Sequence, residues 1–541
     1  ITVDGTLNMQ GTAASPVVLR ARSGISAGTW YGVVISPVAG SADIDHAELR
    51  HARRALESGT PGSVTQVDDV LIDSCSDIGL YIDGGSASYD RVSVSDCVNY
   101  GVYVADGTPT LDALVADNTR FGVYVANQAG ATIQNAIVRD QGSYGVYASM
   151  SSSSDGDVNV FGSTVYNSRY GVYLSASSGT TRSLVVRNSN LTDSTSYGAF
   201  RSGSYGRLEV TYTNSWGNGN NLSGTTGSVG NLSANPLYVS ASNLRLTSNS
   251  PSRFAGNGGQ DLGPLPYVAD ATVGLIGYLW SNLTLTAAGS PHVIPGDLTV
   301  AAGRSLTIQA GAQLHFESGD LMGSNRDTSR IELTVDGTLN VQGTAPSPVV
   351  FRARSGVSAG TWYGIVVSST AAGADIDHAE LRHARRALES ATPGTLTQVD
   401  DLLIDSDAPR PGTVYRAIAD RPVKGQGGMF LKTPDGPAFL RPVKGVAPGQ
   451  ALRVQVSGYA EPGKAIPVTQ KILFKSRYAI VTPDAPGLNI SRSIRDDDLR
   501  DQLLEIAHEA LDGRETGLIL RSCCAAAATD DIAEDIDAMV S

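Results

Sequence analysis

The stretch RVSVSDCVNYGVYVADG, residues 91–107, decides the fold. Apolar and polar residues alternate on both sides of Gly101, as in strands that bury one face, and no part of the stretch has the composition of a helix. A glycine followed by an apolar and an aromatic residue recurs at positions 79, 101, 122, 145, 171 and 198. The steps are 22, 21, 23, 26 and 27 residues. Short strands at this spacing predict a parallel β-helix with one coil per step.

The register within a coil predicts which side chains point inward. The residue after each glycine and the one two positions further share parity, so we expect both in the core, as with Val102 and Val104. The residue between them then points outward. This predicts a stacked row at Tyr81, Tyr103, Tyr124, Tyr147, Tyr173 and Phe200. We interpret the row as a structural ladder, with a sugar-stacking platform as the alternative.

A second row is predicted at a corner, four residues before each glycine. Its members are Cys75, Cys97, Asn118, Gln141, Asn167 and Ser194. The Cα atoms of Cys75 and Cys97 should be about 5 Å apart, inside the disulfide range. We expect contact between them, and a bond only in an exported protein.

A tandem duplication sets the larger organisation. Residues 1–74 repeat as residues 333–406, with 59 identities in 74 positions, which indicates a duplicated module. After the shared ending, the first copy continues with Cys75 and the coil pattern. The second copy continues with Asp407, and the pattern stops.

These repeats resemble the right-handed β-helix, pectin-lyase-like repeats of large bacterial surface proteins, over about residues 1–406. The resemblance implies a mainly β fold with a first β-helix at 1–267, closed by a segment at 235–263, and a second, truncated module at 268–406. It also implies a surface protein that contacts other cells or glycans.

Pectin-lyase-like enzymes carry several Asp with Arg or Lys on one outer face, sometimes around calcium. The matching residues here are Asp43, Asp45, His46 and Arg50, repeated at Asp375, Asp377, His378 and Arg382. Because no second coil shows matching acids, we interpret them as a solvated face and predict no catalytic or metal-binding residue in the chain.

Composition excludes some classes of protein. The net charge of −13 argues against a chain that binds nucleic acid over its whole surface, although a local basic region can exist. No apolar run is long enough to span a bilayer. Four Cys are too few for a disulfide-rich scaffold. Ile1 lies inside a repeat, so we expect that the true N-terminus is missing.

From Asp407 onward Lys, Arg and Pro increase and LRDQLLEIAHEAL, residues 499–511, has a helical pattern. The diagnostic segments, in chain order, are TVYRAIADRPVKGQGGMFLKTPDGPAFLRPVKG (413–445), GQALRVQVSGYAEPGKAIPVTQKILFKSRYAIVTP (449–483), GLNISRSI (487–494) and TGLILRSCCA (516–525). Together they resemble the N-terminal half of the ribonuclease E/G family, over about residues 401–541.

This resemblance implies an OB-fold barrel at 407–475 that binds single-stranded RNA, and part of a 5′-sensor at 476–541. The RNA-facing residues would be Phe430, Phe439 and Lys464, and the 5′-phosphate ligands Arg521 and Ser522. The CCAAAA that follows departs from the family's glycine-bearing continuation. Basic side chains for a phosphate groove, or for scattered solubilising charge, are Arg416, Arg421, Lys424, Lys432, Arg441, Lys444, Lys464, Lys471 and Lys475.

The intact family cleaves RNA with magnesium held by paired Asp in a later domain, and also binds zinc through a Cys motif. Neither is expected in this chain, so the resemblance implies RNA binding without cleavage and without a cofactor.

The change of family inside the string VDDLLIDS predicts a chimera. The two parts of the chain imply different cellular compartments, since the β-helix suggests the cell surface and the ribonuclease-like segment suggests the cytoplasm. The alternative is an extracellular β-helix adhesin or glycan-binding protein with no RNA role.

Overall fold

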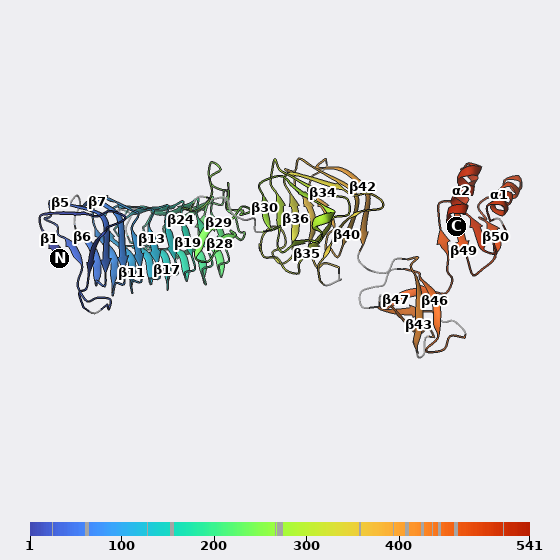
Figure 1. Cartoon of the computed structure of the whole chain (residues 1–541), viewed down its shortest axis with the longest axis horizontal. Helices are drawn as coiled ribbons and strands as arrows, with labels where there is room; N and C mark the ends of the chain where they lie inside the picture. The colour runs from blue at the N-terminus through green and yellow to red at the C-terminus, as the bar shows by residue number, and fades with distance from the viewer. Residues whose placement is uncertain are drawn as a thin grey trace. The chain divides into compact units, whose positions relative to one another are not determined.

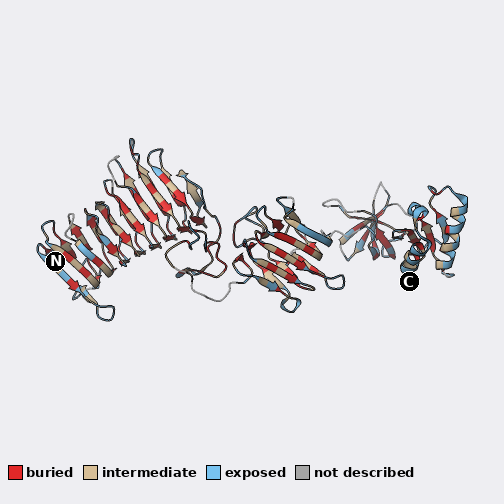
Figure 2. Cartoon of the chain, turned by 90° about the horizontal axis from the view of Figure 1, so that it is seen from above, coloured by how far each residue is buried: buried red, intermediate tan, exposed pale blue. Residues whose placement is uncertain are grey.

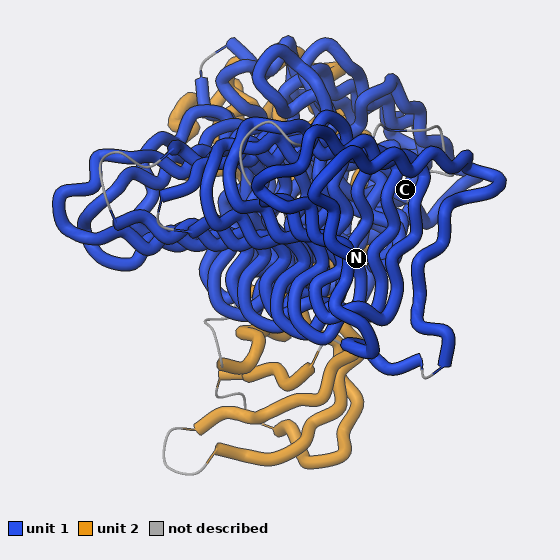
Figure 3. Tube along the Cα trace, turned by 90° about the vertical axis from the view of Figure 1, so that its left-hand side faces the viewer, with its two compact units in different colours: residues 1–405 blue, residues 406–541 orange. Residues whose placement is uncertain are grey.

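The computed structural model forms two compact units, Ile1–Asp405 and Ser406–Ser541 (Figure 3). The residues outside its description are 24, 60–63, 127, 152–155, 266, 268–273, 356–358, 393, 406–410, 424–426, 435, 442–444, 459–463, 512 and 541.

Unit 1 begins with a solenoid whose coils stack as parallel strands (Figure 1). One face is a ten-stranded sheet of β1 (Thr2–Val3), β4 (Val33–Ile35), β6 (Arg54–Gly59), β8 (Ile78–Asp83), β11 (Tyr100–Asp106), β14 (Phe121–Val125), β17 (Tyr144–Met150), β20 (Tyr170–Ala176), β23 (Tyr197–Ser202) and β26 (Asn220–Ser223).

A second, bent sheet receives two strands from most coils. Its strands are β2 (Thr6–Gln10), β3 (Val17–Arg20), β5 (Ser41–Arg50), β7 (Val64–Asp73), β9 (Ser88–Asp90), β10 (Ser93–Ser95), β12 (Thr110–Asp112), β13 (Val115–Asp117), β15 (Ala131–Gln134), β16 (Ile137–Arg139), β18 (Val158–Phe161), β19 (Thr164–Tyr166), β21 (Ser183–Arg187), β22 (Asn190–Thr192), β24 (Arg207–Thr211), β25 (Asn214–Trp216) and β27 (Thr225–Thr226). The predicted parallel β-helix is therefore confirmed.

Alternation places the core between these sheets. Val102 and Val104 are fully buried and pair in register with Val123 and Val125 of the next coil, as predicted. Buried residues consequently run as stripes across successive strands (Figure 2). The recurrent glycines lie where coils approach closely. A Cβ on Gly145 would be 2.4 Å from Val165 Cγ1 and 2.5 Å from the Gly171 oxygen, so no other residue fits this position without displacing its neighbours.

The predicted corner row is wrong at two positions. The buried column contains Thr119 and Ser168 instead of Asn118 and Asn167, because the corner-to-glycine distance is one residue shorter in those coils. Asn118 and Asn167 belong to the adjacent outer column, where positive φ recurs at Ser74, Asp96, Asn118, Asp140, Asn167 and Asp193.

The contact predicted between Cys75 and Cys97 is confirmed. Both thiols are buried and free. Burial, together with the hydrogen bond to Cys75, raises the pKa of the Cys97 thiol. Cys75 and Cys97 are therefore free thiols in contact, one coil apart.

The predicted closing segment includes an antiparallel pair, β28 (Tyr238–Ser240) and β29 (Asn243–Leu246). It packs along the outside of the last coils. Tyr238 lies 6.2 Å from Tyr166, ring to ring, and the Asn190 amide donates to the Leu262 oxygen.

The second module repeats the architecture on a smaller scale. One sheet contains β30 (Gly277–Leu279), β33 (Leu298–Val300), β36 (Glu332–Val335), β39 (Gly364–Val367) and β41 (Leu388–Ser390). The other contains β31 (Leu283–Leu285), β34 (Ser305–Gln309), β37 (Thr338–Gln342), β40 (Gly373–Arg382), β38 (Val349–Ala353), β35 (Gln313–Phe316), β32 (His292–Ile294) and β42 (Leu396–Asp405), with a short 3-10 turn η1 (Ala287–Gly289) between β31 and β32.

The last coil of this module is left open. β42 pairs with β40 in the register that β7 has with β5, since Asp377 faces Asp400 as Asp45 faces Asp68. In the first copy further coils cover β7, and Val67 and Ile72 are 1% and 0% exposed. The equivalent Val399 and Ile404 of β42 are 42% and 60% exposed.

Unit 2 contains a closed five-stranded barrel and a four-stranded sheet with two helices. The barrel order is β43 (Val414–Pro422), β44 (Met429–Thr433), β45 (Gly436–Leu440), β47 (Ile466–Thr469) and β46 (Ala451–Val456). The sheet order is β48 (Phe474–Lys475), β49 (Ala479–Thr482), β51 (Gly517–Leu520) and β50 (Gly487–Ile490), with α1 (Asp497–Leu511), η2 (Ser522–Ala526) and α2 (Thr529–Val540). Across the described residues, no helix is both long and apolar enough for a membrane crossing.

Candidate functional site

The two phenylalanines predicted to face RNA lie together on the barrel. Alternation on β44 and β45 sends Met429, Leu431 and Ala438 into the barrel core and leaves Phe430 and Phe439 partly exposed on its outside. They are direct cross-strand partners, with ring centroids 5.7 Å apart. The two rings form one apolar patch on the barrel wall.

This patch lies in a groove of about 1910 Å³. The charged lining residues are Asp420, Arg421, Lys432, Arg441, Lys464 and Lys471, five basic and one acidic. The Arg421 guanidinium lies 5.3 Å from the Phe430 ring centre, and Lys432 pairs with Asp420 at 3.1 Å. The groove is locally cationic on a chain whose net charge is −13.

The structure brings together only some of the predicted basic residues. Lys464, predicted as a site residue, is in the groove, whereas Arg416 and Lys475 are not among its lining residues. Lys424 and Lys444 lie outside the described part of the chain.

Arg521 and Ser522 follow β51 and are not among the residues that line the groove. The Arg521 guanidinium donates to the backbone oxygens of Ser476 (2.5 Å) and Arg477 (3.1 Å). Both contacts use Nη1, which fixes the side chain beside β48.

Next to Arg521 and Ser522 in the sequence, Cys523 is exposed and Cys524 is buried. Burial raises the pKa of the Cys524 thiol to about 11.

The aromatic row of unit 1 stacks as predicted, and a second column lies beside it. In the first column, centroids repeat every 5.0–5.5 Å. The second column contains Tyr100, Phe121, Tyr144, Tyr170 and Tyr197. From Tyr100 to Tyr173, rings of the two columns meet nearly at right angles, for example 88° for Tyr100 and Tyr103.

These numbers indicate a herringbone packing. Rings in contact at about 3.5 Å that repeat at 5.0 Å must tilt by about 45° from the solenoid axis. Opposite tilts in the two columns then give the near-perpendicular contacts. Ring faces are covered by the neighbouring rings, which favours the structural ladder over a platform for stacked sugars. Burial raises the pKa of Tyr103, Tyr124 and Tyr147 accordingly.

The acids of the first coil do have partners in other coils, contrary to the sequence interpretation. Asp43 and Asp45 alternate with buried Ile44 on β5, so both face outward. Asp45 is in register with Asp68, Asp68 with Asp90, and Asp90 with Asp112. The sequence interpretation missed this column of four acids.

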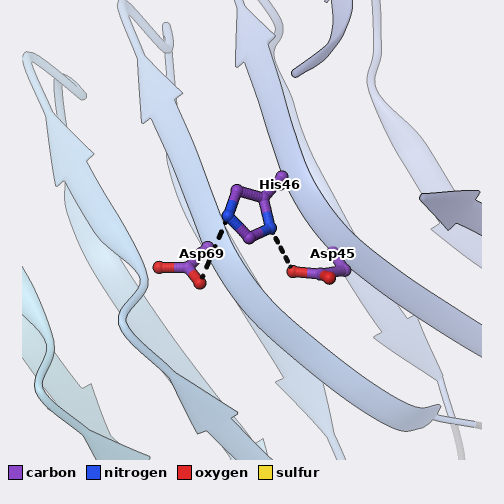
Figure 4. A group of neighbouring side chains, drawn as sticks. All are labelled: Asp45, His46 and Asp69. Atoms are coloured by element: carbon purple, nitrogen blue, oxygen red, sulfur yellow. Dashed lines mark hydrogen bonds and ion pairs between the residues drawn. The ribbon is translucent and has the colours of Figure 1, made fainter. Parts of the chain in front are cut away.

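His46 joins this column through two carboxylates (Figure 4). Its Nδ1 is 2.6 Å from Asp45 Oδ1, and its Nε2 is 3.7 Å from Asp69 Oδ2. Both His46 and Asp69 have positive φ, which turns the chain at the bend of the sheet and brings their side chains together. Another candidate, Arg50, is engaged elsewhere, because it pairs with Glu48 at 2.9 Å. In the second module, Arg382 pairs with Glu380 in the same way.

A buried carboxyl pair in the second module serves the fold. Asp297 accepts hydrogen bonds from the Glu332 amide and the Ser324 hydroxyl, and Glu332 from the amides of Arg326 and Asp327. Burial raises the pKa of Asp297 to about 8 and that of Glu332 to about 7. The pair fastens the loop between β35 and β36 to the sheet.

Comparison with known proteins agrees with both resemblances. Residues 78–249 match the family model of the right-handed beta helix region, and residues 277–384 that of the pectate-lyase-like beta helix domain. Residues 474–541 match the ribonuclease E/G family. That match covers the sheet and helices of unit 2, including Arg521 and Ser522, and begins after the barrel.

A curated relative, probable ribonuclease FAU-1 of Staphylothermus marinus, is 35% identical over 102 residues. The similarity covers 18% of this chain and 21% of the relative, so the chain spans about a fifth of that protein's length.

Sequence reasoning missed two groups of residues at these sites. The second aromatic column had a signal, because an aromatic residue precedes five of the six glycines. No signal in the sequence could have predicted the role of Arg91, which reaches acids of two coils, because that contact depends on how the coils stack.

Proposed function

We propose that the barrel of unit 2 is an OB-fold that binds single-stranded RNA, and that the chain binds RNA without cleaving it. The observation that carries the proposal is the groove, where two adjacent phenylalanine rings lie among five basic side chains. Unstacked bases bind to aromatic faces and phosphates bind to flanking cations, which makes such a surface suited to single strands of any sequence.

The strand arrangement supports the OB-fold assignment. In chain order, the five strands run 1-2-3-5-4 around the barrel, and the fourth strand closes onto the first. The third and fifth strands, β45 and β47, pair in parallel and all other neighbours are antiparallel. A closed five-stranded Greek-key barrel is the OB architecture.

The family match of residues 474–541 supports a second contact, with the 5′ end of the RNA. Arg521 has a planar guanidinium able to form paired hydrogen bonds with phosphate oxygens. Its Nη2 takes part in neither of the two backbone contacts described above, which both use Nη1. Exposed Ser522 beside it adds a hydroxyl donor. We propose that these two residues bind a 5′-monophosphate.

The proposal is tested by titrating labelled single-stranded RNA with the intact chain at two salt concentrations. Binding should weaken steeply with salt, because each phosphate contact releases counterions. Lys464→Ala should reduce the salt slope by about one unit. In the same experiment, Arg521→Ala should weaken only RNA that carries a 5′-monophosphate. The alternative, a β-helix adhesin with no RNA role, predicts no binding at either salt concentration.

We propose further that the chain is a chimera joined within residues 399–406. The shared string ends at Ser406, and the boundary between the two compact units falls at Asp405 and Ser406. The open last coil supports a solenoid interrupted at that point, since Val399 and Ile404 lose the cover that their first-copy equivalents have. Long sequencing reads across codons 395–415 are expected to separate the two halves. A single genomic read that carries both would establish a genuine fusion and refute the chimera.

A further inference from the structure

The same Asp–His–Asp cluster occurs in both modules of unit 1. In the first module it consists of Asp45, His46 and Asp69, and in the second of Asp377, His378 and Asp401. Within each cluster the candidate ligand atoms lie within 4.8 Å of one another. The two copies are partly exposed and share the same strand register. Because the two clusters contain the same residues in the same register, a difference in their chemistry must come from the neighbouring residues.

In the first module the cluster already holds a cation (Figure 4 shows its three side chains). Arg91, from the next coil, donates through Nε to Asp69 at 2.9 Å and also pairs with Asp68 and Asp90. The hydrogen bond from Arg91 lowers the pKa of the Asp69 carboxyl. The guanidinium thus neutralises the acids that surround His46.

In the second module no described residue plays the role of Arg91. The duplication ends at Ser406, so the second module has no counterpart of Arg91, and the residue at the same offset, Val423, belongs to unit 2. Among the described residues, Asp401 forms an ion pair with His378, whose Nε2 is 3.1 Å from Asp401 Oδ2. Asp400 and Asp377, in register on adjacent strands, add further negative charge.

Hydrogen-bond accounting shows what this cluster lacks. His378 Nδ1 is 2.5 Å from Asp377 Oδ1, the geometry of an N–H donated to a carboxylate. A neutral imidazole has a single N–H, so Nε2 then presents a lone pair to the carboxylate of Asp401. The contact at 3.1 Å therefore requires a positive charge between these two atoms, either a second proton on the imidazole or a metal ion.

We propose that the second module binds a zinc ion through His378 Nε2 and Asp401, with Asp377 as the carboxylate that orients the imidazole. A metal-bound histidine commonly donates its other N–H to a carboxylate in this way. Mixed nitrogen and oxygen ligands suit zinc better than calcium or magnesium. Two ligands about 2.1 Å from a tetrahedral zinc ion lie roughly 3.4 Å apart, within about 0.3 Å of the 3.1 Å between His378 Nε2 and Asp401 Oδ2. Water would complete the coordination.

The test is a calorimetric titration of the intact, metal-free chain with zinc chloride at pH 7.5. Wild type should bind one zinc equivalent that is lost in His378→Asn and in Asp401→Asn. His46→Asn is the matched control and should lose none. Every variant carries the same four cysteines, so zinc bound by thiols is common to all and cancels. Circular dichroism of each variant verifies the solenoid.

The first module provides the converse experiment. Arg91→Ala removes the cation from the first cluster and should create one additional zinc equivalent. Adding His46→Asn to Arg91→Ala should abolish that gain. Equal zinc binding by wild type, His378→Asn and Asp401→Asn would overturn the proposed site. Unchanged binding by folded Arg91→Ala would overturn the role assigned to Arg91 and, with it, the comparison that supports the site.

Discussion

The double variant Phe430→Ala/Phe439→Ala is expected to lose at least about 30-fold in affinity for single-stranded RNA at every salt concentration. Stacking of a base on one aromatic ring contributes roughly 1–3 kcal/mol, and both rings lie on one patch in the groove. Removing them leaves the basic side chains in place, so the salt slope should be nearly unchanged. Titration with labelled RNA measures affinity and slope together.

Phe474→Ala is the matched control for this experiment. Phe474 is also an exposed aromatic residue of unit 2, on β48, and it is not among the groove's lining residues. Its replacement should leave RNA affinity unchanged. Wild-type affinity in the double variant would show that the groove is not the RNA-binding surface.

Gly145→Ala should destabilise the solenoid by about 1–3 kcal/mol, toward the upper end of that range for overpacking. The added methyl group would lie 2.5 Å from the backbone oxygen of Gly171 and 2.4 Å from Val165. The backbone of the next coil cannot yield alone, because it is hydrogen-bonded in turn to the coil after it. Denaturant unfolding followed by tyrosine fluorescence should show a lower midpoint.

Gly142→Ala tests whether the steric clash is the cause. A Cβ there would meet only Arg120 Cα at 3.7 Å and the Thr119 oxygen at 3.8 Å, which are ordinary contacts. We expect an unfolding midpoint within error of wild type. If Gly145→Ala matches Gly142→Ala, close approach of the coils does not explain the recurrent glycines.

Sequence periodicity was sufficient to predict the coils because each coil repeats the same inward and outward alternation. Val102, Val104 and the stacked Tyr row follow from that alternation alone. The corner row failed at Asn118 and Asn167 because counting from the glycine assumes a constant corner. There the positive-φ residue lies one position closer to the glycine, and the buried polar residue moves to Thr119 and Ser168.

The candidate sites were predictable to different degrees. Phe430 and Phe439 came from the family resemblance, and strand alternation explains why both face outward. That Arg421 rather than Arg416 lies over Phe430 depends on the register between β43 and β44, which makes Arg421 and Phe430 direct partners. The link between Asp45, Asp68 and Asp90 depends on register between strands 23 and 22 residues apart, which the glycine pattern does not specify.

The exposed edge of β42 makes unit 1 prone to association with other chains. Its backbone donors and acceptors have the arrangement that β7 uses to bind β9 and β10, and Val399 and Ile404 present apolar surface beside them. Such an edge recruits strands from other chains. Pairing along this edge would also cover Val399 and Ile404, so purified chains are expected to associate with rising concentration, regardless of what the groove on the barrel binds.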